Sequence, residues 1–252
     1  MARDAKVEDL AACRCLERVC KQPNHCWYMT DTEIGRLMQG VDRAIPTTGT
    51  RFPDFEFEGG FIEHFQVTST VENKSEGGSE YKREMARFDA RYKKEFAEFK
   101  EKAPCGEAKV FSKYHPQIDN SHDNLKASFK SNWEKHIESL NSNPKYAEQL
   151  SVFMVDYVVP MGLCMCEFAP EGSGRTSPYY RLCWDKDLLE YVQTYKDFVQ
   201  YIIFVTHNAV EVIPTNQIDK LLEDLPHPFE IQAFSTSFSV TNTVLYKIPH
   251  QE

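Results

Sequence analysis

The chain has 252 residues, a formal net charge of −9 and a pI of about 5.5, and 41% of its residues are hydrophobic and 13% aromatic. This apolar content excludes a chain that is disordered throughout. The negative charge excludes a basic surface over the whole protein, although a local basic patch with bound metal can still serve an acidic nuclease.

The N-terminal residues 1–10 carry no apolar signal core, and no run in the chain approaches the roughly 18 apolar residues that a membrane span needs. We therefore expect a cytoplasmic protein with no membrane partner. The eight cysteines would then be mostly reduced thiols.

The first part of the chain predicts two helices and a hairpin. Residues 5–22 show mixed three- and four-residue apolar spacing, and 30–40 form a helix that Thr30, Asp31 or Thr32 can cap and Gly40 can end. Residues 1–45 are thus predicted to be an N-terminal helical segment. Two short strands follow in 51–70, with Gly59 and Gly60 as the turn, and the polar residues 72–79 predict a mobile loop.

A helical section comes next, and we interpret residues 72–145 as a helical insertion. Residues 80–102 predict a long helix whose aromatic stripe packs into a core or against a partner helix, and 122–140 predict a second one. The stripe consists of Tyr81, Met85, Phe88, Tyr92, Phe96 and Phe99.

The C-terminal half is richer in strands. Residues 150–160 are almost continuously apolar, which is typical of a strand buried on both faces, and 162–168 are expected to pair with them. Further strands are predicted at 201–207, 210–214 and 229–248, with helices at 185–199 and 215–225. The order predicts a single α/β (or α+β) domain over 1–252, with a mixed central sheet flanked by helices.

The hairpin carries an unusual density of polar groups. Its carboxylates are Asp54, Glu56, Glu58 and Glu63, and His64 and Gln66 follow at once. Two carboxylates on adjacent strands can hold Mg²⁺, which prefers oxygen ligands and keeps several waters. One of these waters can be activated to attack a phosphodiester, and a third polar group can orient or deprotonate it.

Pro53-Asp54, followed nine residues later by Glu63 on the next strand, resembles the PD-(D/E)xK motif of the restriction-endonuclease-like nucleases. In that superfamily the proline-aspartate opens one strand, the acidic residue and a lysine lie on the next, and a helix and further strands complete a mixed sheet. The resemblance implies that Asp54 and Glu63 bind Mg²⁺ or Mn²⁺. The implied activity is endonucleolytic cleavage of DNA, with a role in restriction or defence.

The sequence departs from this motif at one position, because Phe65 stands where the lysine is expected. Gln66 could replace the lysine only if a bulge turned it inward, and Lys74 or Lys82 could arrive from elsewhere. Strict alternation puts Glu63, Phe65 and Val67 on one face of the strand, and Ile62, His64 and Gln66 on the other.

Other residue clusters have plainer interpretations. Cys13, Cys15, Cys20 and Cys26, with His25, invite a zinc site, but they contain no Cys-x-x-Cys pair, which favours buried thiols. Asp156, inside a buried run, is either a structural acid with a partner or a further site residue.

Two functions remain open at this point. The first is a metal-dependent DNA endonuclease, in which His64 or Gln66 lies near the attacking water and the local basic patch of Lys126, Lys130 and Lys135 meets phosphate. The alternative is a catalytically inactive relative or an acidic protein-interaction module, with a protein partner or a second copy of the chain. In that case the hairpin carboxylates are a solvated face that blunts edge pairing.

Overall fold

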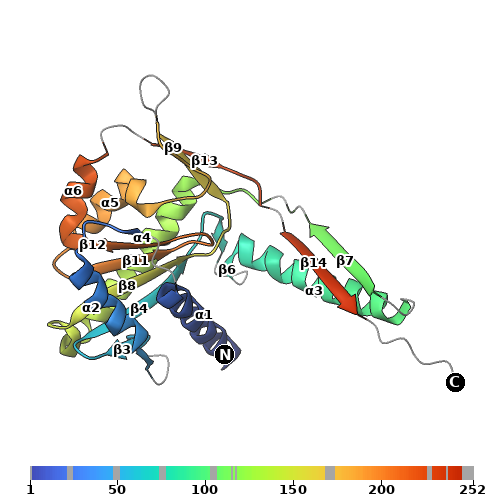
Figure 1. The fold of residues 1–252 in the computed structure, drawn as a ribbon, viewed down its shortest axis with the longest axis horizontal. Helices are drawn as coiled ribbons and strands as arrows, with labels where there is room; N and C mark the ends of the chain where they lie inside the picture. Colours follow the sequence, from blue (N-terminus) through green and yellow to red (C-terminus); the bar gives the residue numbers. More distant parts are fainter. Residues whose placement is uncertain are drawn as a thin grey trace.

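The computed structural model describes residues 2–21, 25–47, 52–73, 78–102, 107–114, 116, 118–167, 174–225, 229–236 and 238–245. Its main body is an α/β arrangement around one mixed sheet of seven strands (Figure 1). The strand order is β1-β12-β11-β8-β4-β3-β2. These strands are β1 (His25–Cys26), β2 (Ile45–Pro46), β3 (Phe55–Phe57), β4 (Gly60–Val67), β8 (Leu150–Tyr157), β11 (Tyr201–Val205) and β12 (Val210–Pro214).

Three parallel strands form the centre of this sheet. β8 lies between β4 and β11 and is parallel to both, whereas the β3–β4 and β11–β12 pairs are antiparallel hairpins. Residues 151–155 of β8 are all buried, which confirms the prediction of a strand covered on both faces. The mixed central sheet and both predicted hairpins are therefore confirmed.

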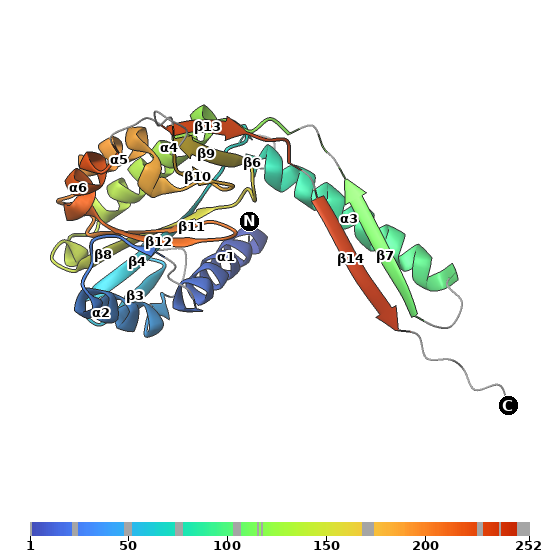
Figure 2. The same ribbon diagram turned by 45° about the horizontal axis from the view of Figure 1, so that its top comes forward.

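Helices cover the two faces of the sheet (Figures 1 and 2). One face packs with Ala12, Cys15 and Val19 and is here called the α1 face. The other packs with Phe129 and Trp133 and is called the α4 face. The α1 face is covered by α1 (Ala2–Lys21) and α2 (Asp31–Asp42), and the α4 face by α4 (His122–Asn141), α5 (Lys186–Gln193) and α6 (Ile218–Glu223).

The second helix begins as the sequence predicts. The hydroxyl of Thr30 accepts a hydrogen bond from the backbone of Glu33, and the Glu33 carboxylate accepts one from the backbone of Thr30, which is a complete capping box. The helix continues past Gly40 to Asp42. Among the described residues, no helix combines the length and apolar character needed to cross a bilayer.

An arm extends from the main body (Figures 1 and 2). It consists of α3 (Glu80–Lys102) and an antiparallel pair formed by β7 (Glu107–Tyr114) and β14 (Phe238–Leu245). On α3 the ring of Phe88 stacks on those of Tyr114 and Phe238, at 6.4 Å and 5.6 Å between ring centroids. Phe88 of the aromatic stripe thus packs against a two-stranded sheet whose first strand the sequence did not predict.

The range 72–145 is not one helical insertion. α3 and β7 belong to the arm, whereas α4 packs directly on the central sheet and buries Leu125, Phe129 and Trp133 there. At the two ends of the polar range 72–79, β5 (Glu72–Asn73) and β6 (Gly78–Ser79) pair with each other. Lys74 lies outside the described residues.

A separate three-stranded sheet corrects another expected pairing. β9 (Leu163–Glu167) does not pair with β8 but lies between β10 (Thr176–Ser177) and β13 (Phe229–Ala233). Both edges of β8 are already occupied by β4 and β11, so β9 has no free edge to join. Short 3-10 helices complete the described chain, namely η2 (Pro144–Tyr146), η4 (Leu182–Trp184) and η5 (Thr215–Gln217).

Candidate functional site

The β3–β4 hairpin brings Asp54 and Glu63 together. Phe55 pairs with Ile62 across the hairpin, so Asp54 stands opposite Glu63 just before β3 begins. The backbone N–H of Asp54 donates to Oε2 of Glu63 at 3.2 Å, and the backbone N–H of His64 donates to Oδ2 of Asp54 at 2.7 Å. Each carboxylate therefore accepts a backbone hydrogen bond from the opposite side of the hairpin.

Glu63 is the more enclosed of the two, with 6% of its surface exposed. It points to the α4 face, where Nδ1 of His136 lies 2.5 Å from its Oε1. Burial raises the pKa of Glu63, and the charge of Asp54 raises it further, while the hydrogen bond with His136 lowers it. The site thus combines two interacting carboxylates with an imidazole.

His136 was not among the residues predicted from the sequence. Its ring stacks on that of Phe65 with 4.7 Å between centroids and 14° between planes. It lies on α4 three residues after Trp133, which is fully buried. That spacing puts His136 near the buried face of the helix, and it is the signal that could have identified the residue.

An open pocket of about 950 Å³ lies beside the hairpin, lined there by Phe52 and Glu56 and not by Asp54 or Glu63 themselves. Thr47, at its rim, donates its backbone N–H to the carbonyl oxygen of Asp54 at 2.9 Å. Lys135 precedes His136 on α4, and Lys145 lies 3.6 Å from the Glu56 carboxylate. Two lysines and two glutamates, Glu56 and Glu138, therefore line the pocket, together with Pro46, Phe52, Ser139, Ser142, Asn143 and Tyr146.

His64 and Gln66 do not join this site, which corrects the expected single group of Asp54, Glu63, His64 and Gln66. The pairing of β4 with β8 runs without interruption from Gly60 to Val67, so no bulge turns Gln66 around. Strict alternation holds, and His64 and Gln66 point to the α1 face. There the Gln66 amide donates to Oδ2 of Asp156 at 3.0 Å, and His64 Nε2 is 3.9 Å from the same oxygen.

Two lysines of the predicted local basic patch contact other side chains of the protein. Lys126 forms ion pairs with Asp123 at 3.2 Å and with Asp187 at 3.0 Å. Lys130 lies over the ring of Tyr191, 4.8 Å from its centroid. Lys82, considered as a source of the missing lysine, is exposed near the start of the arm helix.

The N-terminal cysteines do not gather into a metal site of their own. Cys15 is buried, Cys13 and Cys26 are half-buried, and Cys20 is exposed. Among the described residues, Cys15 is the N-terminal cysteine that lies near other possible metal ligands, and these are His64 and Asp156.

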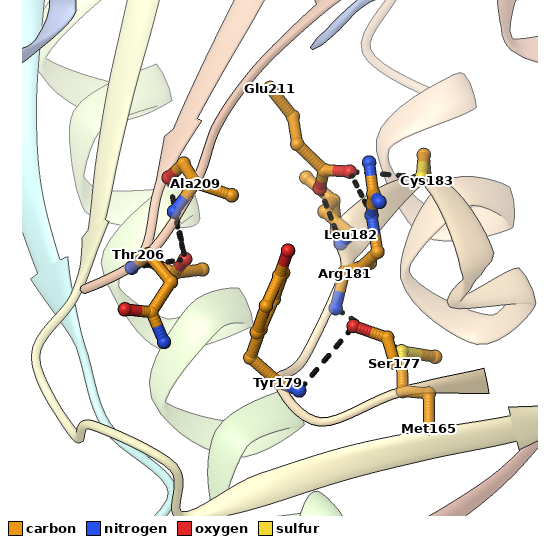
Figure 3. A network of polar contacts seen from close by, with 10 residues as sticks. Met165, Ser177, Tyr179, Arg181, Leu182, Cys183, Thr206, Ala209 and Glu211 are labelled. Carbon is orange, nitrogen blue, oxygen red and sulfur yellow. Dashed lines mark hydrogen bonds and ion pairs between the residues drawn. The ribbon is translucent and has the colours of Figure 1, made fainter. Parts of the chain in front are cut away.

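A buried network around Glu211 has a structural role (Figure 3). The Glu211 carboxylate, 1% exposed, accepts hydrogen bonds from Arg181 Nε at 2.9 Å, the backbone N–H of Leu182 at 2.8 Å and the thiol of Cys183 at 3.0 Å. These contacts attach the segment before α5 to β12. The acid inside the apolar run 210–214 was the available signal.

No protein-family model matches this chain, and no curated protein or solved structure matches it.

Proposed function

We propose that the protein is a metal-dependent DNA endonuclease, in which Asp54 and Glu63 hold Mg²⁺ or Mn²⁺. The observation that carries this proposal is the meeting of these two carboxylates at one face of the β3–β4 hairpin. Glu63 is 6% exposed, so it does not belong to a solvated face of the hairpin. Burying a carboxylate such as Glu63 costs free energy unless a cation or hydrogen bonds compensate it.

The fold supports the same proposal. Part of the sheet follows the order of the chain, with adjacent strands β2-β3-β4-β8-β11. Within this part, β3 is antiparallel to both of its neighbours, and the other four strands are parallel to one another. Asp54 opens β3, Glu63 lies on β4, and α4 then leads to β8. This is the sequence of elements that the resemblance to restriction-endonuclease-like nucleases implies.

The donor set fits a divalent cation with hard oxygen ligands. Two carboxylates and solvent are the ligands that Mg²⁺ prefers. Such an ion, when bound, neutralises charge on phosphoryl oxygens and lowers the pKa of a water. His136 holds the Glu63 carboxylate in place through its Nδ1, and its imidazole is the nearby group that can exchange a proton.

The adjoining pocket supports a phosphodiester substrate. It is open to solvent, and Lys135 and Lys145 line it together with Glu56 and Glu138. The two lysines are the groups in this pocket that can contact a phosphate backbone, in a chain whose net charge is −9.

The second candidate function is an inactive relative that binds a protein partner. Phe65 in place of a lysine, with His136 stacked upon it, is the observation that favours it. An inactive relative has no need to keep the metal ligands functional. The two functions therefore differ in an observable property, the cleavage of DNA with added metal.

The test is nicking of supercoiled plasmid with Mg²⁺ or Mn²⁺, from mildly acidic to mildly alkaline pH. Wild type is compared with Asp54→Asn and Glu63→Gln, and with Glu58→Gln as the control, because Glu58 is exposed in the hairpin turn. We expect wild type and the control to nick and both site variants to lose at least about a hundredfold in rate, as removal of transition-state stabilisation commonly does. Absence of nicking by folded wild type under all these conditions contradicts the proposal and favours the inactive relative.

A further inference from the structure

Three possible metal ligands converge on the α1 face, on the opposite side of the sheet from Asp54 and Glu63. They are the thiol of Cys15 on α1, the imidazole of His64 on β4 and the carboxylate of Asp156 on β8. Their ligand atoms all lie within 4.8 Å of one another. His64 and Asp156 are brought together by the parallel pairing of β4 with β8, and α1 adds the third group from above the sheet.

The imidazole of His64 lacks an expected partner. Its side chain is 6% exposed, and among the described residues Nε2 has no hydrogen-bond partner. Oδ2 of Asp156 is 3.9 Å from this nitrogen, which is too long for a hydrogen bond. A buried polar nitrogen without a partner is unfavourable, and it points into the space that Cys15 and Asp156 also face.

We propose that Cys15, His64 and Asp156 form a transition-metal site whose natural occupant is Zn²⁺. Thiolate, imidazole and carboxylate are all ligands of zinc, whereas a thiolate is a poor ligand for Mg²⁺. Zinc–ligand bonds of about 2.0–2.3 Å place tetrahedral ligand atoms about 3.3–3.8 Å apart. The 3.9 Å between His64 and Asp156 is close to this range, and binding draws in the ligand atoms of the group, which lie within 4.8 Å of one another.

The neighbouring groups suit a coordinated metal. Gln66 donates to the Asp156 carboxylate at 3.0 Å, which fixes the orientation of a ligand as outer hydrogen bonds around metals commonly do. Burial raises the pKa of the Cys15 thiol, and Asp156 raises it further while Arg18 lowers it. A bound cation reverses this balance, because a coordinating thiol gives up its proton to solvent.

The consequence is a link between metal binding and the attachment of α1. Cys15 is the only one of the three ligands outside the sheet, so a bound ion connects the helix to both β4 and β8. Binding energy at such a site adds to folding stability. This site is independent of the nuclease proposal, since it uses the other face of β4.

The experiment uses the full chain, stripped of metal with a chelator and titrated with Co²⁺ as a spectroscopic substitute for Zn²⁺. Wild type is expected to take up one equivalent, with a thiolate-to-cobalt band in the near ultraviolet and the visible bands of tetrahedral cobalt. Zn²⁺ should displace the cobalt, and excess Mg²⁺ should not. Absence of the charge-transfer band in wild type overturns the proposal without any variant.

Two variants identify the ligands. Cys15→Ser should lose the charge-transfer band, whereas Cys13→Ser, a half-buried thiol on the same helix, should keep it. A band that survives in folded Cys15→Ser contradicts the assignment. Gln66→Leu should weaken binding by about 10- to 100-fold, as loss of outer hydrogen bonds does. Added Zn²⁺ should also raise the melting temperature of wild type, and an unchanged melting temperature would count against the site.

Discussion

The imidazole of His136 lies almost parallel to the ring of Phe65, and from that position its Nδ1 reaches Oε1 of Glu63 at 2.5 Å. Phe65 thus supports an imidazole that α4 brings to the carboxylate of β4. The hydrogen bond with His136 and its charge both lower the pKa of Glu63. His136 therefore opposes the effects of burial and of Asp54 on the same carboxyl.

The variant His136→Phe keeps the stacking on Phe65 but removes the hydrogen bond to Glu63. We expect the pKa of Glu63 to rise further, because burial and the charge of Asp54 are then unopposed by His136. Carboxyl ¹³C chemical shifts followed by NMR over a pH titration measure this directly. Ser139→Ala, one turn later on α4, is the control and should leave the titration unchanged. A fall in the Glu63 pKa in His136→Phe would contradict this account.

The raised pKa of Glu63 also predicts how stability depends on pH. A carboxyl whose pKa is higher in the folded state favours folding most when protonated, below its ordinary value of 4.5. Its contribution to the free energy of unfolding falls as the pH rises through the folded-state pKa. Glu63→Gln lacks this loss, so the variant should gain stability relative to wild type as the pH rises from 4.5 to neutrality.

Urea unfolding at several pH values measures that difference, in the absence of divalent metal. Glu58→Gln is the control, since Glu58 lies exposed in the turn, and its curve should stay parallel to that of wild type. If the curve of Glu63→Gln also stays parallel to wild type, Glu63 does not titrate with a raised pKa.

Gly60 is required where β4 leaves the hairpin turn. A Cβ at this position would lie 2.8 Å from the backbone oxygen of Leu150 and 2.3 Å from the ring of Phe57. The ring can move, but the backbone of β8 is held in the parallel pair. Gly60→Ala should therefore destabilise the protein by about 1–3 kcal/mol, the usual range for overpacking.

Gly35→Ala is the matched control for that change. Gly35 lies inside α2, and a Cβ there meets no atom within 4 Å. Alanine favours a helix over glycine, so this variant should be more stable than wild type by up to about 1 kcal/mol. Equal unfolding free energies for the two variants, measured in urea, would contradict the close approach of β4 and β8 at Gly60.

The periodic parts of the fold could be predicted from the sequence. The continuous apolar run of β8 and the β3–β4 hairpin are local patterns, and they appear where expected. The sides of β4 could also be predicted, because alternation along a strand fixes which residues share a face. Asp54 and Glu63 stand opposite each other because β3 and β4 pair as an antiparallel hairpin.

Contacts between distant segments could not be predicted. β7 pairs with β14, about 130 residues later, and no local pattern announces that pairing. His136 and Cys15 reach β4 from separate helices, one on each face. Alternation along β4 separates Glu63 from His64, but it does not say which helix supplies a further group to each face. Tertiary packing decides which face of the sheet each helix covers, and local helix propensity does not predict it.

The buried pair of Arg181 and Glu211 gives the last prediction. Arg181→Met leaves Glu211, 1% exposed, without its cation, although the N–H of Leu182 and the thiol of Cys183 still donate to it. We expect a loss of about 3 kcal/mol in the free energy of unfolding, the lower end of the usual cost of removing one partner. Adding Glu211→Gln removes the uncompensated charge but keeps an acceptor for Leu182, so the double variant should recover much of that loss. If single and double variants unfold at the same urea concentration, the charge of Glu211 is not what Arg181 compensates.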